Sequence, residues 1–160
     1  MTRRRSIATA ILATWLVTAA WDFVCATLLS VLAYGSTAAR LWQGVASAVL
    51  GPRALTMGVR GVVGGLALHL AVAFVWSAAF VLAASRIAAL RRAITSPRGA
   101  IAVASIYGPI IWVVMSLVVV PLATRRAPAI GFRWWVQVVA HIPFVTLPLV
   151  FTARRWLHER

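Results

Sequence analysis

Three ionisable side chains lie inside long apolar stretches of this sequence and are its best candidates for chemistry: Asp22, His69 and His141. A charged side chain at the centre of a bilayer costs at least about 2.5–3.5 kcal/mol, so such residues are expected to face other helices and find polar partners. A histidine changes its charge near neutral pH. We therefore expect one shared polar cluster, in which Asp22 forms a hydrogen bond with either histidine.

Three uses fit such a cluster. A buried polar clasp would fix which helix packs against which. A proton relay or a ligand site between helices would suit a small transporter or channel subunit, which would need to oligomerise. Two histidines on different helices would also suit axial ligation of haem b. The sequence has no metal-ligand spacing, Ser-His-Asp order, P-loop, GxGxxG or HExxH pattern, so we expect neither a metal site nor an enzyme.

The spacing of small and polar residues predicts that the cluster faces inward. In the first apolar run such residues recur at every fourth position through Asp22, and in the second they run from Gly61 and Gly65 to His69. Small residues mark close helix contacts in lipid, so the two glycines predict helix packing. The polar residues expected around the cluster are Thr18, Tyr107, Gln137 and Ser116.

The elements that must position these residues are four apolar runs in a chain of 160 residues that is 62% hydrophobic. About 20 apolar residues cross a bilayer as a helix. We expect transmembrane helices over about residues 7–34, 58–84, 100–120 and 134–152, with a short interfacial helix over about 37–50. The predicted fold is all-α, a four-transmembrane-helix bundle that forms a single membrane domain over residues 1–160.

The arginines predict an orientation. All 16 basic residues are arginines; ten lie in the N-terminus, segment 85–98 and the C-terminal tail, and six in the other two connections. The positive-inside rule then places both termini in the cytoplasm. Because these charges flank the apolar runs, we expect lipid headgroups and not nucleic acid as their partners. Trp42, Trp134 and Trp135 are expected near the outer interface.

Several motifs spread over residues 13–155 carry a family resemblance: Asp22, segments 43–51 and 65–70 with Ala73, Tyr107-Gly108, segment 120–122, and His141 with Pro148. Through them the sequence resembles a family of small uncharacterised bacterial four-helix inner-membrane proteins. The resemblance implies no activity, and it favours treating Asp22, His69 and His141 as one set. The family pattern has an asparagine after the methionine of the third helix, whereas Ser116 follows Met115 here.

These observations predict a non-enzymatic, multi-pass protein of a bacterial inner membrane, without a cofactor. Its Asp/His cluster would serve helix packing or an interface with a partner, either a second copy of the chain or another membrane protein. Two alternatives remain. One is a small oligomeric proton-linked transporter or channel subunit, and the other is a haem-b-binding electron-transfer subunit.

Overall fold

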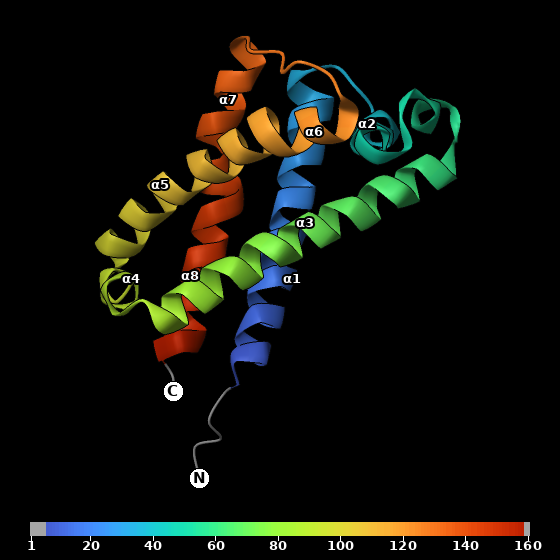
Figure 1. Cartoon of the computed structure of the whole chain (residues 1–160). Helices are drawn as coiled ribbons and strands as arrows, with labels where there is room; N and C mark the ends of the chain where they lie inside the picture. Colours follow the sequence, from blue (N-terminus) through green and yellow to red (C-terminus); the bar gives the residue numbers. More distant parts are fainter. Residues whose placement is uncertain (1–5, 159–160) are drawn as a thin grey trace.

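The computed structural model describes residues 6–158, which contain helices and no strand. Four helical passes are long and apolar enough to cross a membrane, which confirms the four predicted helices. They are Ile7–Ala33, Val59–Arg86, Pro97–Thr124 and Phe132–Leu157. The N- and C-terminal ends of the described chain lie at the same end of the bundle as the short helix α4, Ala88–Ala93 (Figure 1).

The first pass consists of α1 (Ile7–Leu28) and a five-residue π-helical turn, η1 (Leu29–Ala33). Ser6 caps its start, because the Ser6 hydroxyl accepts a 3.1 Å hydrogen bond from the Thr9 amide. The small and polar stripe of this helix faces inward as the spacing predicts. Ala10, Thr14, Thr18 and Ser30 are buried in the bundle, whereas Leu12, Leu16 and Leu28 are exposed.

The predicted interfacial helix is present as α2, Ala38–Leu50, which lies across α3, Val59–Arg86. Gly61 and Gly65 of α3 make this close approach possible, since a Cβ on Gly65 would overlap the Trp42 carbonyl and one on Gly61 would overlap the Ala54 carbonyl. The glycines thus pack against α2 and the 3-10 turn η2 (Pro52–Thr56) that follows it.

Trp42, which was expected near the outer interface, is buried inside the protein. Its side chain is only 3% exposed and stacks on Phe23 of α1, with ring centroids 5.1 Å apart. The reason is the glycine contact with α3, which draws α2 so near the bundle that its apolar face packs on protein.

The last two passes are broken by π-helical turns, whereas α3 is α-helical throughout. Prolines remove backbone donors in these passes and disturb the regular ladder. In the turn η4 the Thr146 hydroxyl donates a 2.7 Å hydrogen bond to the Ala104 carbonyl, which ties the fourth pass to the third. The third pass consists of α5 (Pro97–Val114), η3 (Met115–Val119) and α6 (Val120–Thr124). The fourth pass consists of α7 (Phe132–His141), η4 (Ile142–Thr146) and α8 (Leu147–His158).

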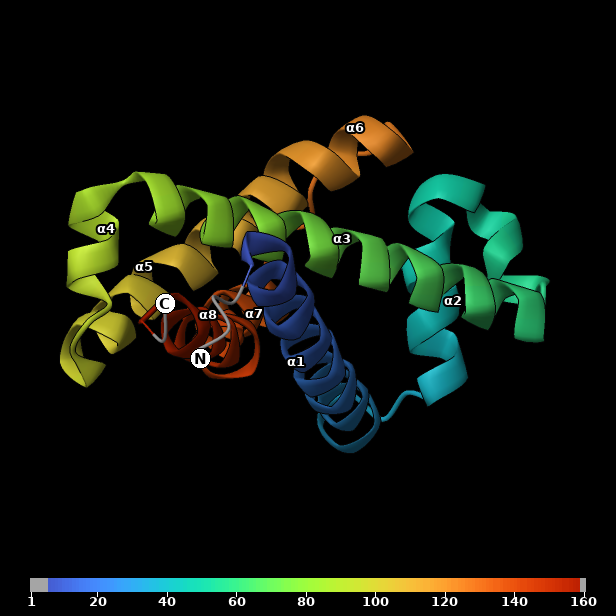
Figure 2. The ribbon, with the colours of Figure 1, turned by 90° about the horizontal axis from the view of Figure 1, so that it is seen from below.

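The tightest part of the core lies at the end of the bundle that holds the termini. There Phe80 and Val81 of α3 pack with Ala104 of α5 and with Leu149 and Val150 of α8. Toward the other end α3 crosses away from α1, as both ribbon views show (Figures 1 and 2). The helix α2 fills only part of the space that this divergence leaves, so a cavity remains beside it.

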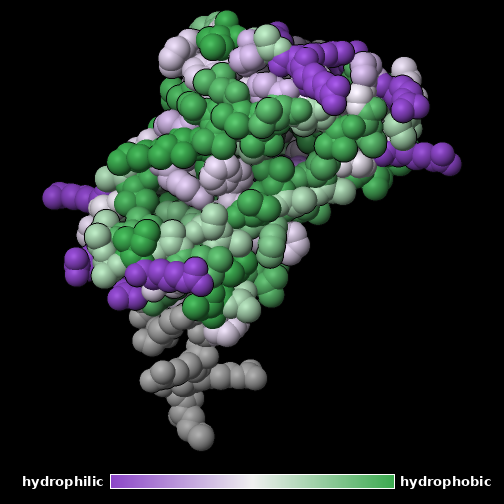
Figure 3. All heavy atoms as spheres, viewed as in Figure 1, coloured by the Kyte–Doolittle hydropathy of each residue, from purple (hydrophilic) through white to green (hydrophobic). Residues whose placement is uncertain are grey.

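The surface between the two ends of the bundle is largely apolar. Figure 3 shows hydrophobic residues over most of the middle of this face, with hydrophilic residues gathered toward both ends. Exposed apolar side chains of this kind include Leu32, Val75, Ile106 and Val139. Patches this extensive are rare on soluble monomers, whereas a helix bundle in contact with lipid requires them.

Candidate functional site

The candidate site is a cavity of about 700 Å³ between the first, second, third and fourth passes and α2. Asp22 reaches it from α1, His69 from α3 and His141 from the end of α7. The structure therefore brings the three ionisable residues to the wall of one cavity. The sequence reasoning expected them near one another but did not foresee the cavity.

Asp22 and His69 form the direct contact of the site. The His69 Nδ1 atom lies 3.6 Å from the Asp22 Oδ2 atom, and the two side chains are 11% and 28% exposed, respectively. The other ring nitrogen of His69, Nε2, is 3.1 Å from the Ala19 carbonyl of α1. Both nitrogens of His69 thus contact α1, so this residue links the first two passes.

These contacts restrict where the protons of His69 and Asp22 can lie. A carbonyl oxygen only accepts hydrogen bonds, so the contact with Ala19 requires a hydrogen on Nε2 of His69. In a neutral His69 the Nδ1 lone pair would then face the Asp22 carboxylate. One proton removes this unfavourable arrangement, either on Nδ1 or on the carboxyl group. Both arrangements that satisfy the two contacts place one proton between the Asp22 and His69 side chains.

Aromatic rings hold His69 in place. The Trp42 ring lies edge-on to the His69 ring, with centroids 5.0 Å apart. The Trp42 ring also stacks on the ring of Phe23. Gly65 lies one turn before His69 and allows α2 to bring Trp42 to this position. The packing of α2 on α3 and the position of the imidazole therefore depend on each other.

His141 stands apart from this pair. Its Nδ1 donates a 2.8 Å hydrogen bond to the Gln137 carbonyl of its own helix, and its ring packs against Trp112 at 5.0 Å. It lies within electrostatic range of Asp22 without a direct contact. Of the two partners that the sequence left open for Asp22, the structure selects His69. A neutral His141 keeps Nε2 as a hydrogen-bond acceptor.

The four polar residues expected around the cluster divide into two groups. Thr18 lines the cavity one turn before Asp22, is 1% exposed, and its Oγ1 has no hydrogen-bond partner among residues 6–158. Gln137 takes part through its backbone carbonyl. Tyr107 and Ser116 are not lining residues of this cavity. Both were expected around the cluster, and they lie outside the cavity, where neighbouring helices engage their hydroxyls.

The hydroxyls of Tyr107 and Ser116 serve packing instead. Tyr107 donates a 3.0 Å hydrogen bond to the Trp76 carbonyl of α3. The Ser116 hydroxyl accepts a 2.9 Å hydrogen bond from the Trp134 indole of α7. Each bond joins the third pass to a neighbour, so these residues position the wall of the cavity from outside it.

Sequence reasoning missed three lining residues of the cavity: Trp76, Trp112 and Arg40. Trp76 follows His69 by two helical turns, so the helical spacing carried a signal for it. The Trp112 indole nitrogen is buried without a hydrogen-bond partner in the described part of the chain. Arg40 lies in the first turn of α2, and only the fold of α2 against α3 brings it to the cavity.

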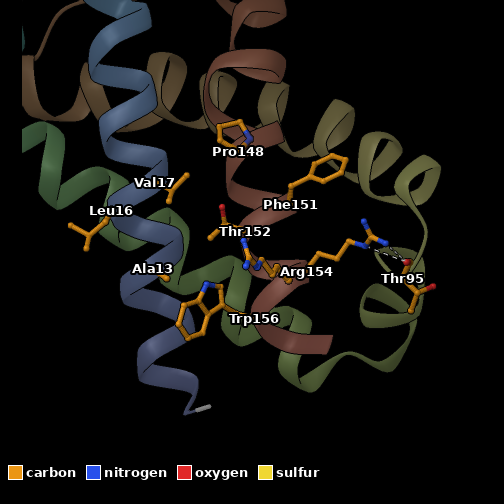
Figure 4. Close-up of a pocket in the computed structure, with 10 residues that line it drawn as sticks. Ala13, Leu16, Val17, Thr95, Pro148, Phe151, Thr152, Arg154 and Trp156 are labelled. Carbon is orange, nitrogen blue, oxygen red and sulfur yellow. Dashed lines mark hydrogen bonds between the residues drawn. The ribbon is translucent and has the colours of Figure 1, made fainter. Parts of the chain in front are cut away.

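A second, shallower cavity of about 900 Å³ lies between α1 and α8 near the termini. Figure 4 shows Arg154 extending from α8 to the Thr95 carbonyl, to which it donates two hydrogen bonds of 2.8 and 3.2 Å. Trp156 turns toward α1 in the same view. None of the three ionisable candidates lines this cavity.

The arrangement of His69 does not fit a haem held between two histidines. Axial ligation uses a ring nitrogen with a free lone pair, whereas Nε2 of His69 donates to Ala19 and Nδ1 faces Asp22. Within residues 6–158 no group of three or more His, Cys, Asp or Glu side chains is placed to hold a metal ion. Comparison of the chain with protein-family models, curated proteins and solved structures found no match.

Proposed function

We propose that this chain is a non-enzymatic, multi-pass membrane protein in which the Asp22–His69 pair fixes the packing of the first two passes beside a cavity. The observation that carries this proposal is the 3.6 Å contact between the two side chains, covered by Trp42. Removing one partner of a buried ion pair typically costs about 3–5 kcal/mol, because the other group is left uncompensated. By this cost the pair would favour the arrangement of the first two passes in which both partners meet.

The proposed location is a bacterial inner membrane, with both termini in the cytoplasm. Three observations support it: the four apolar helical passes, the excess of arginines in the terminal segments and segment 85–98 of the sequence, and the family resemblance of the sequence. The partners expected there are lipids and either a second copy of the chain or another membrane protein.

A second candidate function is proton-linked transport as an oligomer. The observation that favours it is the cavity itself, because it places a shared proton and a second histidine, His141, beside a space large enough for a small molecule. Measuring the mass of the detergent-solubilised protein tests this candidate. A strictly monomeric state at all concentrations would contradict it, since four helices alone are few for a transport pathway.

A double-mutant cycle on Asp22 and His69 tests the clasp. The variants are Asp22→Ala, His69→Ala and the double variant, unfolded with SDS in mixed micelles and followed by circular dichroism. We expect each single change to destabilise the fold and the double variant to lose less than the sum, with a coupling of about 1–3 kcal/mol.

The matched control cycle pairs Asp22→Ala with Ser116→Ala. Ser116 contacts the Trp134 indole and does not line the cavity, so the two changes should add. If the Asp22–His69 cycle is as additive as this control, the two residues do not act as a clasp.

A further inference from the structure

The cavity beside the Asp22–His69 pair has the size and lining of a small-molecule site. Its volume of about 700 Å³ falls in the range typical of such sites, roughly 300–1,000 Å³. Most of the lining side chains are aliphatic, and Trp76 and Trp112 add aromatic surface. The body of a ligand that fits here is therefore apolar.

The polar corner of this cavity is rich in hydrogen-bond acceptors. Asp22 is the only acidic residue in segment 6–158, and its side chain is 28% exposed although it lies among apolar helices. Thr18 is 1% exposed, one turn away on the same face, and its Oγ1 is unpartnered within the described residues. Without its shared proton, the pair offers a further acceptor in His69 Nδ1. Such a corner suits a ligand that donates several hydrogen bonds.

We propose that this cavity binds a protonated primary or secondary amine with an apolar body, in exchange for the proton that Asp22 and His69 share. The ammonium nitrogen donates to the Asp22 carboxylate and to His69 Nδ1, two acceptors only 3.6 Å apart. The proton that they shared leaves to water. One positive charge enters and one leaves, so the charge of the site is unchanged.

The apolar body of the amine packs against Trp76 and Trp112, which line the same cavity. A neutral ligand of the same shape would gain the apolar contacts but could not replace the positive charge of the shared proton. An anionic ligand would meet repulsion at Asp22.

The other ionisable groups around Asp22 do not remove its preference for a cation. His141 already donates from Nδ1 to its own helix, so its neutral form presents an acceptor to the cavity. Cys25 lies within electrostatic range of Asp22 on α1 and is neutral as a thiol. Arg40, on the α2 wall, is the permanent cation of the lining; it repels a cationic ligand, but its side chain is exposed and solvent screens its charge.

Equilibrium binding of the amine is separate from transport, which needs movement across the bilayer, and from the share of stability that the Asp22–His69 pair provides. For the transport candidate, the substrate class would be an apolar amine exchanged for a proton.

The test uses three probes of nearly one shape: 1-naphthylmethylamine, which is cationic at pH 7, neutral 1-naphthylmethanol and anionic 1-naphthylacetate. Each is titrated calorimetrically into the full chain in zwitterionic nanodiscs, with empty nanodiscs as the blank. Charge-assisted hydrogen bonds lead us to expect the amine to bind about 10- to 100-fold more tightly than the alcohol. Equal binding of the two, or tighter binding of the acetate, would overturn the proposal.

Variants and a proton count make the test specific. Asp22→Asn should abolish the preference for the amine, Thr18→Val should weaken amine binding about fivefold, and the lipid-facing Val139→Ala should change neither. If Asp22→Asn fails to fold, amine binding by Thr18→Val tests whether the polar corner of the cavity binds the amine. Titration in phosphate and in HEPES, whose heats of ionisation differ, should show release of about one proton per amine bound. No release, or an unchanged preference in the folded variants, would refute the exchange.

Discussion

Replacing Gly65 with alanine tests the close approach of α2 that builds the site. A Cβ at this position would lie 2.6 Å from the carbonyl carbon of Trp42 and closer still to its oxygen. Two carbon atoms pack at about 3.5–4.0 Å, so α2 would have to retreat by roughly 1 Å. The retreat also loosens Trp42 from Phe23 and His69, because Trp42 moves with α2 whereas the other two rings belong to α1 and α3.

The neighbouring Gly64 provides the matched control. A Cβ there would meet Leu50 at 3.5 Å and Ala46 at 3.8 Å, which are ordinary contacts. Both substitutions gain about the same helix propensity, roughly 1 kcal/mol, so their difference isolates the steric term. Overpacking typically costs about 1–3 kcal/mol, and a rigid backbone neighbour favours the upper end of that range.

We therefore expect Gly65→Ala to be about 3 kcal/mol less stable than Gly64→Ala. The measurement is the free energy of unfolding in mixed SDS micelles, followed by far-ultraviolet circular dichroism. Two variants of equal stability would show that α2 does not press on α3 at Gly65. The glycine contact would then not explain why Trp42 is buried.

Two further predictions follow from single hydrogen bonds, and a third follows from the proposed orientation. Thr146→Val removes the hydrogen bond that joins η4 to α5 and should cost about 0.6–1.5 kcal/mol in the same unfolding assay, whereas Thr146→Ser should retain most of it. Trp15→Phe removes a 2.8 Å hydrogen bond to a carbonyl of α3 and should cost a similar amount; unchanged stability would contradict that bond. In a Cys25→Ser background, a cysteine at Arg92 should react with an impermeant thiol reagent only from the cytoplasmic side and one at Arg126 only from the outside. The reverse pattern would overturn the proposed orientation.

Much of the architecture could be read from local patterns. The apolar runs are long enough to form helical passes, Ser6 and Thr37 cap helices through their own hydroxyls, and Gly51 ends α2 with a positive φ of 69°. The inward stripe around Asp22 follows from the helical repeat alone. These features depend on residues within a few positions of each other, so the sequence is sufficient to predict them.

The partner of Asp22 was decided by tertiary structure. Both histidines lie at plausible depths in their runs, and the choice of His69 depends on how α3 crosses α1. That crossing in turn depends on α2, which lies against Gly61 and Gly65 and carries Trp42 into the interior. No local pattern encodes these contacts, because they join residues that are distant in the sequence.

Thr18 and Tyr107 show the same limit of what local sequence patterns predict. Both carry hydroxyls on apolar helices, yet Thr18 lines the cavity while Tyr107 bonds to a carbonyl of α3. The sequence by itself determined that this chain forms four apolar helices with ionisable groups on packing faces, since helix length and periodicity are local properties. Only the tertiary structure decided which of those groups meet and that a cavity lies beside them, because both depend on the angles at which the helices cross.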